Sequence, residues 1–317
     1  MDIVLGTMTF GGQVDKAGSA RLLELFGQRG HRQLDTAYVY VYNDGATETL
    51  LGELRADGLI ADQPIAGKAN PHHFGGLTPD SVTRQLHTSL ERLGSDSLDL
   101  FYLHMPDLGT PIELTLATLA EHHAAGRFRR FGLSNYAAWQ VAEIVGLCTA
   151  NGWPRPVVYQ GMYNALTRDV ERELLPCLAR FGIDFYAYNP LAGGLLSGKY
   201  RRIDDLPSDG RFADNASYQA RYWKPDYFAA IARFADSAIA HGIEPAAAAL
   251  RWLVHHSALA KGDEDTAHAV ILGATSQAHL VANLDACEQG PLPHELVAAL
   301  DAGWDTVRPA CIAYFRT

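Results

Sequence analysis

The alternation of short apolar runs with helix-type segments constrains the fold of this chain more than any other sequence feature. Segments of helical period, such as 22–26 and 82–93, separate the apolar runs. Alternating strands and helices are typical of a parallel sheet built from βα units. Eight such units predict an α/β fold, a closed (β/α)8 TIM barrel. The eight predicted strands lie near residues 3–7, 32–36, 64–68, 98–103, 129–133, 156–160, 184–188 and 269–272.

The 317 residues contain no Gly/Ser- or Pro-rich linker, so we predict a single barrel domain over 1–317. Two stretches exceed one βα unit: residues 189–225 after the seventh strand, and residues 290–317 after the last barrel helix. Long loops in compact domains usually serve a site or are disordered. We expect the first to be ordered around a ligand, because it holds or adjoins Phe212, Tyr218, Tyr222, Trp223 and Tyr227.

Charge and composition exclude several classes of protein. With 26 basic and 36 acidic residues the net charge is -10, which disfavours binding to nucleic acid. No apolar run approaches the roughly 18 to 20 residues of a membrane span, and the strand-like start at Met1 lacks a basic leader, so a cytoplasmic protein is expected. The cysteines form no C-x-x-C pair, which predicts buried free thiols at Cys148, Cys177, Cys287 and Cys311.

Familiar nucleotide and metal motifs are absent from the sequence. No two glycines are separated by a single residue, which excludes G-x-G-x-x-G, and there is no P-loop motif. The paired histidines at 72–73, 122–123 and 255–256 include neither H-x-H nor H-E-x-x-H. Since adjacent histidines on a regular element point in different directions, no metal site is predicted.

Polar residues end three consecutive predicted strands: Asp35, Lys68 and His104. Adjacent barrel strands lie about 4.8 Å apart, so their carboxyl ends can bring the Asp and the Lys together, each reducing the desolvation cost of the other. A purely structural ion pair would explain these two equally well. His104 considered alone is more often a structural histidine than a catalyst, but three such residues together favour a site.

A tyrosine follows Asp35 by a few residues and completes a chemical argument. A free phenol titrates near pH ~10, and a neighbouring ammonium group lowers that pKa by favouring phenolate. Lys68 would therefore make the tyrosine a usable general acid. Asp35 would hold the ammonium group in place, and His104 could point at the oxygen that receives the proton.

At this point the residues resemble the aldo-keto reductase superfamily, and within it most closely the aflatoxin-aldehyde and succinic-semialdehyde reductase group. The resemblance covers essentially the whole chain. Its motifs recur in order as VLGTMTFGG, LDTAYVY with YNDGATETLLG, IAGKAN, LDLFYLHMPD, RFGLSNY, VVYQGMYNAL, FYAYNPLAGGLLSGKY, GRF with RYW, VILGATS and the terminal YFR. The resemblance implies a barrel that binds NADPH without a Rossmann domain and reduces aldehydes or ketones to alcohols.

The resemblance also implies the roles of individual residues. The catalytic tetrad would be Asp35, Tyr40, Lys68 and His104. Nicotinamide would lie on Tyr188, with its carboxamide held by Ser134, Asn135 and Gln160, although Tyr188 could also be barrel core. The pyrophosphate would run past Asn189, Leu191, Gly193, Leu195 and Lys199, covered by Arg211. The 2′-phosphate would meet Gly273, Thr275, Ser276 and Asn283, with His279 where the family usually has Gln.

The identity of the proton donor is open to a second interpretation. The dipeptide VY at 39–40 repeats at 41–42, as if two residues had been inserted. Counting from the strand end selects Tyr40, whereas counting back from the turn Asn43-Asp44-Gly45 selects Tyr42. We prefer Tyr40, because the rigid strand end sets its distance from Asp35.

The residues that line the substrate pocket follow less directly from the sequence than the residues of the tetrad. Met8, Trp223, Arg221 and Arg316 are candidate substrate residues, and an arginine there would favour a carboxylate-bearing aldehyde. The alternative is that these arginines are exposed and contact nothing.

Two rival functions are a nicotinamide-binding regulatory subunit with little turnover and a biosynthetic sugar ketoreductase. Members of the family often form homodimers. The start at Met1 leaves no room for an N-terminal hairpin, so the helix expected over 290–303 is a candidate cover for the barrel floor.

Overall fold

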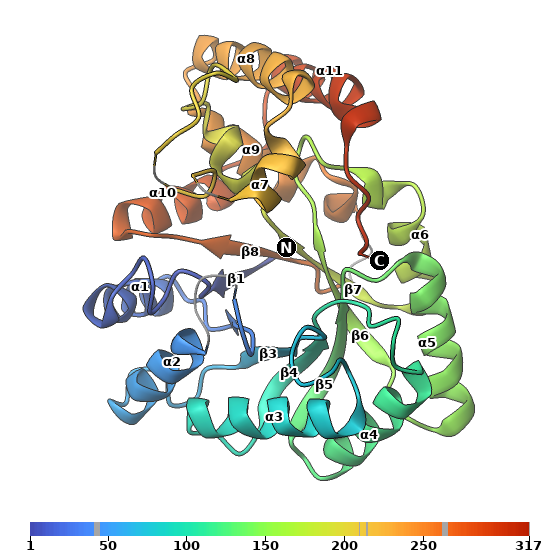
Figure 1. Cartoon of the computed structure of the whole chain (residues 1–317). Helices are drawn as coiled ribbons and strands as arrows, with labels where there is room; N and C mark the ends of the chain where they lie inside the picture. The colour runs from blue at the N-terminus through green and yellow to red at the C-terminus, as the bar shows by residue number, and fades with distance from the viewer. Residues whose placement is uncertain (41–44, 209, 214, 262–265, 317) are drawn as a thin grey trace.

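The computed structural model describes residues 1–40, 45–208, 210–213, 215–261 and 266–316, and these form a closed parallel barrel (Figure 1). Each strand pairs with the next, and the last pairs with the first. All eight predicted strands are present, so the predicted TIM barrel is confirmed. They are β1 (Asp2–Gly6), β2 (Leu34–Asp35), β3 (Ile65–Ala69), β4 (Leu98–Leu103), β5 (Phe128–Ser134), β6 (Pro156–Met162), β7 (Asp184–Tyr188) and β8 (Ala269–Gly273).

Amphipathic helices surround the barrel, and α3 illustrates why they begin and end where they do. The Thr78 hydroxyl caps its first turn by accepting from the Ser81 N–H at 3.4 Å, Pro79 occupies the first turn, and Gly94 ends it at φ 57°. The helices of this ring are α1 (Lys16–Gln28), α2 (Ala46–Ala56), α3 (Pro79–Leu93), α4 (Ile112–Ala124), α5 (Ala138–Asn151), α6 (Leu174–Phe181), α9 (Pro245–His255) and α10 (Gln277–Glu288).

The interior of the barrel is filled by side chains and is not a pore. Tyr102 on β4 occupies the space beside Gly132, where a Cβ would lie 2.5 Å from its ring. The Tyr102 ring centroid is 5.6 Å from the Lys68 Nζ, so this interior ring lies next to the strand-end lysine. The buried interior cluster consists of Val4, Ala66, Leu100, Tyr102, Val158, Tyr186, Ala269 and Ile271.

The long segment after β7 has its own apolar packing. It contains the 3-10 helix η2 (Ala192–Ser197), then α7 (Ala216–Tyr222), and leads into α8 (Pro225–Ala240). The Phe212 ring lies 5.0 Å from that of Trp223 and 6.4 Å from that of Tyr222. The predicted aromatic residues therefore order this segment by contacting one another, while its ordering around a ligand stays a prediction.

The C-terminal helix α11 (His294–Val307) packs against α8, and Figure 1 shows these two helices side by side, outside the ring. Asp301 on α11 also pairs with Arg168 at 2.7 Å, just beyond β6. The expectation that a helix over 290–303 covers the barrel floor is therefore wrong. The apolar face of α11, which includes Leu296 and Leu300, is buried against other outer elements instead.

Beyond α11 the chain returns to the barrel. The Tyr314 hydroxyl accepts from the Ala138 N–H at 3.0 Å and donates to Glu173 at 2.9 Å. The Arg316 N–H then donates to the Asn135 carbonyl at 2.9 Å, at the carboxyl end of β5. The terminal residues thus reach the same end of the barrel as the strand-end residues.

Among the described residues, no helix has the length and apolarity needed to cross a membrane. The same residues contain no group of three or more His, Cys, Asp or Glu side chains that could hold a metal ion. The four cysteines are free thiols; Cys148 and Cys287 are buried as predicted, whereas Cys177 and Cys311 are only partly buried, so their predicted burial is wrong.

Candidate active site

Asp35 and Lys68 form a buried ion pair at the carboxyl ends of β2 and β3. The Lys68 Nζ donates to the Asp35 Oδ2 at 2.6 Å and to the Thr36 carbonyl at 2.6 Å. Lys68 is 1% exposed and Asp35 is 5% exposed, so the two charges are removed from water together. Burial lowers the pKa of Lys68, and the adjacent carboxylate of Asp35 opposes this shift.

Gln160 on β6 binds the other oxygen of the same carboxylate. Its Nε2 donates to the Asp35 Oδ1 at 2.7 Å. Both oxygens of Asp35 therefore have a donor, which fixes the carboxylate and, through it, the ammonium group of Lys68. The sequence predicted Gln160 only as a partner for the nicotinamide carboxamide, so this contact was missed.

Tyr40 lies next to the ion pair, with its ring centroid 5.9 Å from the Lys68 Nζ. Burial, with the negative charges of Asp35 and Glu48, raises the pKa of Tyr40 well above its ordinary value. The lowering of this pKa that the sequence predicted from Lys68 is not found, because burial, the largest effect, raises the pKa of Tyr40. The raised pKa keeps the phenol protonated at neutral pH. The rival Tyr42 lies outside the described residues.

His104 follows β4 directly and is held through its backbone, because its N–H donates to the Ala69 carbonyl at 2.9 Å. Burial lowers the pKa of its imidazole to about 3, and the positive charge of Lys68 adds to the effect. The ring is therefore neutral at physiological pH. A neutral imidazole keeps one N–H donor, which can bind a carbonyl oxygen.

Asn135 and Tyr188 link the ends of β4, β5 and β7. Asn135 has φ 63°, and its Nδ2 donates to the His104 carbonyl and to the Ser134 hydroxyl, each at 2.9 Å. The Tyr188 hydroxyl donates to the Asn135 Oδ1 at 2.8 Å. Asn135 therefore binds two other residues predicted to hold the nicotinamide, Ser134 and Tyr188, and the backbone of His104.

The turn after β7 combines left-handed backbone with a basic side chain. Asn189 has φ 56° and Gly193 has φ 71°. A Cβ on Gly193 would lie 2.9 Å from the Tyr218 ring, so glycine is needed for space as well as for conformation. The Arg211 Nη1 donates to the Asn189 Oδ1 at 3.3 Å and to the Tyr218 hydroxyl at 3.1 Å. The same turn carries Leu191 and Leu195, while Lys199 beyond it is exposed.

The segment after β8 lies under the same arginine. The Arg211 Nη2 is 3.6 Å from the place where a Cβ on Gly273 would stand. Ser276 begins α10, and its hydroxyl accepts from the N–H of His279 at 3.2 Å. The Thr275 hydroxyl is 3.1 Å from the His279 Nδ1, and Asn283 donates to the Gly273 carbonyl at 3.5 Å. The two predicted phosphate segments therefore meet at Arg211.

The four candidate substrate residues are not equivalent in the structure. Arg221 and Arg316 both act to lower the pKa of Tyr188, against the larger raising effect of burial, so both positive charges lie close to this ring. Trp223 instead donates its indole N–H to the Ile203 carbonyl at 2.7 Å and packs on aromatic rings of the long segment. Met8 follows β1.

The sequence analysis did not identify the ion pair between the buried Glu48 and Arg92. Glu48 on α2 is 0% exposed, and its Oε2 lies 3.2 Å from the Nη1 of Arg92. Burial raises the pKa of Glu48 to about 7. The sequence did contain a pattern that indicates the burial of Glu48. Glu48 precedes the apolar Leu51 by three residues, so the two side chains share the buried face of α2.

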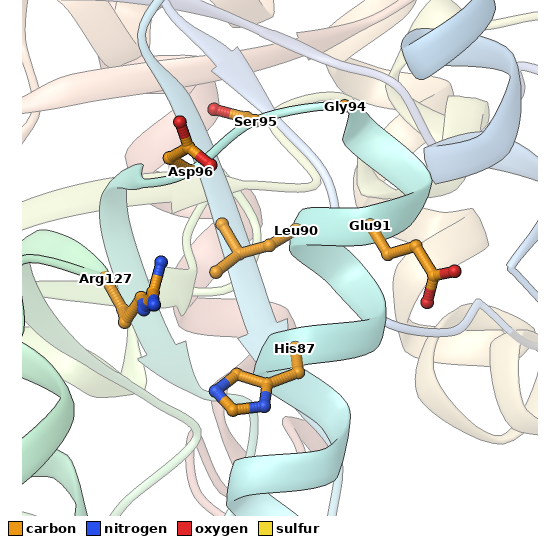
Figure 2. A pocket seen from close by; sticks show the side chains of 7 residues that line it. All are labelled: His87, Leu90, Glu91, Gly94, Ser95, Asp96 and Arg127. Carbon is orange, nitrogen blue, oxygen red and sulfur yellow. The ribbon is translucent and has the colours of Figure 1, made fainter.

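A shallow surface depression lies at the opposite end of the barrel and is unrelated to these residues. Figure 2 shows its lining, which includes His87 and Glu91 on α3 and Arg127 just before β5. Because α3 ends at Gly94 and the chain then enters β4, this depression faces the amino ends of the strands. The candidate site is at their carboxyl ends.

Comparisons with known proteins identify the family of this chain. The model of the Aldo/keto reductase family matches residues 2–305. Human aflatoxin B1 aldehyde reductase member 2 is 49% identical, with 99% of this chain and 89% of the relative covered. Human aldo-keto reductase family 7 member A3 is 48% identical, covering 99% of this chain and 96% of that protein. An aldo-keto reductase of Pseudocercospora fijiensis is 41% identical over 93% of this chain and 100% of its own length. The chain therefore belongs to the aldo/keto reductase family and is an oxidoreductase that acts on carbonyl groups.

Proposed function

We propose that this protein reduces an aldehyde or ketone to the alcohol with NADPH, and that Tyr40 donates the proton. The observation that carries the proposal is the buried Lys68, paired with Asp35 at 2.6 Å and 5.9 Å from the Tyr40 ring, beside a neutral His104. An ammonium, a phenol and an imidazole at neighbouring strand ends are what a carbonyl oxygen needs in order to accept a hydride at carbon and a proton at oxygen.

Each residue has a separate part in this reaction. His104 donates a hydrogen bond that orients the carbonyl oxygen. Tyr40 gives its phenolic proton to that oxygen as the alcohol forms, and Lys68 stabilises the phenolate until solvent returns a proton. NADPH, when bound, supplies the hydride that adds to the carbonyl carbon. Asp35 and Gln160 keep the ammonium group in position.

Several features of the described residues fit a dinucleotide. The left-handed Asn189 and Gly193 permit close backbone approach after β7, and Arg211 lies between this turn and Gly273. The first turn of α10 has N–H groups suited to an anion. We propose that nicotinamide lies on Tyr188, with its carboxamide at Ser134, Asn135 and Gln160, and that the phosphates follow these segments. The further cofactor residues proposed are Leu191, Leu195, Lys199, Thr275, Ser276, His279 and Asn283.

The proposal is tested by Lys68→Met together with Tyr40→Phe and Tyr42→Phe. Lys68→Met should lower kcat about 10²- to 10⁴-fold, the usual share of a general acid, with NADPH affinity nearly unchanged in a fluorescence titration. Tyr40→Phe should abolish turnover and Tyr42→Phe should not. Full kcat in Lys68→Met would contradict the assigned role, and loss of turnover only in Tyr42→Phe would move the proton donor to that residue. Parallel assays with NADPH and NADH test the choice of cofactor.

For the substrate we propose an aldehyde that carries a negative charge. Support comes from the positive charges of Arg221 and Arg316 beside Tyr188, at the mouth of the barrel. Trp223 is the weaker candidate, since its contacts lie within the long segment, and Met8 stays a prediction. Relatives from human, mouse and rat are named aflatoxin B1 aldehyde reductases. A cytoplasmic location and a homodimer also stay predictions.

A further inference from the structure

We infer that Arg92 is a positioning residue for the reaction, which fixes Tyr38, two residues before the proposed proton donor Tyr40, and also contacts Gly45 just before α2. The inference rests on the proposed role of Tyr40. Arg92 lies in the last turn of α3, far along the chain from β2 and α2. Among the described residues, no interaction joins it to Lys68 or His104, so it would act through Tyr38.

The first contact is with Tyr38, two residues before the proposed donor. The Arg92 Nη1 donates to the Tyr38 carbonyl at 3.1 Å, and its guanidinium carbon lies 4.7 Å from the centroid of the Tyr38 ring. The Tyr38 N–H donates to the Lys68 carbonyl at 3.1 Å. The backbone of Tyr38 is therefore bound on one side to the strand that carries the ammonium group and on the other to Arg92.

Two further aromatic rings contact the Tyr38 ring in edge-type arrangements. The ring lies 5.7 Å from His73 and 6.0 Å from Phe74, both in the loop after β3, and Tyr38 is only 5% exposed. The ring is thus enclosed by a guanidinium group and a loop from a neighbouring strand. Such enclosure leaves little rotational freedom to the residue that precedes the donor by two positions.

The second contact of Arg92 is with Gly45, the residue before α2. Gly45 precedes α2 with φ 78°, and a Cβ there would lie 2.3 Å from the guanidinium carbon of Arg92. Only glycine leaves room for the guanidinium group at this point. One side chain therefore contacts both Tyr38 and Gly45.

Glu48 holds Arg92 in this place. Its carboxylate is fully buried and lies 3.2 Å from the Arg92 Nη1, the same nitrogen that donates to Tyr38. A buried ion pair adds little net stability, because desolvation offsets the attraction. The pair is better explained by the geometry that it imposes. The planar guanidinium can stack on Tyr38 while its N–H groups bind two acceptors, which an ammonium group cannot do.

The test compares Arg92→Met, Arg92→Lys and Glu48→Gln with a matched control, Arg129→Met. Arg129 also pairs with an aspartate, Asp99, but its side chain is 70% exposed and lies away from the site. Arg92→Met should lower kcat about 10- to 100-fold with KM for NADPH within about twofold, since misplacement of a reacting group by about 1 Å costs on the order of 10²-fold. Arg92→Lys should recover part of that loss, Glu48→Gln should lower kcat less, and Arg129→Met should not change kcat.

The readouts separate positioning from stability. A merely structural role would lower the melting temperature and leave kcat per folded molecule unchanged, and this result in both Arg92 variants would overturn the inference. If Arg92→Met does not fold, Arg92→Lys and Glu48→Gln decide by the same criterion. Tyr40→Phe and Tyr42→Phe are assayed alongside. If both variants keep turnover, the proposed function fails. If either variant loses turnover while the Arg92 variants keep the wild-type kcat, only this inference fails.

Discussion

At the scale of single residues, burial determines the protonation states in this site. His104 has its pKa lowered to about 3 from 6.5, and the pKa of Tyr40 is raised. Both shifts favour the neutral form of the group, which is the form that donates a hydrogen bond or a proton to a carbonyl oxygen. The ionised members, Asp35 and Lys68, are those that bind each other. Pairing explains why these two charges are tolerated out of water.

The lowered pKa of His104 predicts a loss of stability in acid. Its folded pKa lies below the unfolded value of 6.5, so the unfolded chain binds more protons between about pH 6.5 and 3, and stability falls as pH falls through this window. The slope is at most about 1.4 kcal/mol per pH unit. His104→Gln should remove this contribution. We expect chemical denaturation to show that wild type loses more unfolding free energy than the variant between pH 6.5 and 4; parallel curves would exclude a neutral buried His104.

At the scale of elements, the close approach of α2 and α3 sets the position of Arg92. A Cβ on Gly52 of α2 would lie 1.9 Å from the Arg92 carbonyl oxygen. Backbone cannot move away as the end of a flexible side chain can. The two helices therefore lie as close as they do only because residue 52 is glycine.

Gly52→Ala should accordingly destabilise the protein by about 2 kcal/mol or more, through overpacking against backbone. Gly146→Ala is the matched control, since Gly146 lies within α5 and a Cβ there meets nothing within 4 Å. That control should gain about 0.5 to 1 kcal/mol from lower chain entropy. Unfolding free energies from denaturant titration provide the comparison, and equal effects of the two substitutions would show that the helices can separate at no cost.

The elements themselves were predictable to different degrees. Strands such as β4 agree with the sequence because an apolar run bounded by polar residues is a local property. The second strand was predicted over 32–36, and regular pairing covers only Leu34–Asp35. Single backbone hydrogen bonds flank it: the Gln33 carbonyl accepts from the Leu5 N–H at 3.0 Å, and the Thr36 N–H donates to the Ala66 carbonyl at 2.8 Å. The sequence showed the amphipathic period of α11, but it did not show that α11 packs against α8. An apolar helix face does not specify which apolar surface covers it.

At the scale of the whole molecule, the C-terminal segment joins the outer helices to the site. Arg168 pairs with Asp301 on α11 and lies 4.1 Å above the ring of Trp252 on α9. Tyr314 then binds Ala138 and Glu173, which places Arg316 against Asn135. The terminal residues therefore reach the barrel mouth by a chain of contacts that spans the fold.

Tyr314→Phe should loosen this connection, since it removes the hydroxyl that binds both partners. If Arg316 contributes to binding a carboxylate, KM for succinic semialdehyde should rise about tenfold, equivalent to about 1.4 kcal/mol, while KM for butanal changes little. Steady-state kinetics with the two aldehydes measure the difference, and Arg316→Ala should reproduce it. Equal changes for both substrates would indicate a general loss of order at the barrel mouth and would contradict a carboxylate site at Arg316.

The sequence by itself determined the barrel, the order of its strands and the positions of Asp35, Lys68 and His104 at strand ends. Each of these depends on the local alternation of apolar and polar residues and on the rule that the carboxyl ends of parallel strands meet. Only the tertiary structure decided that Gln160 binds Asp35 and that Arg92 reaches Tyr38 from the end of another helix. The physical reason is that a buried polar side chain takes its partner from whichever element packs beside it, and the distance between them along the chain carries no information about that choice.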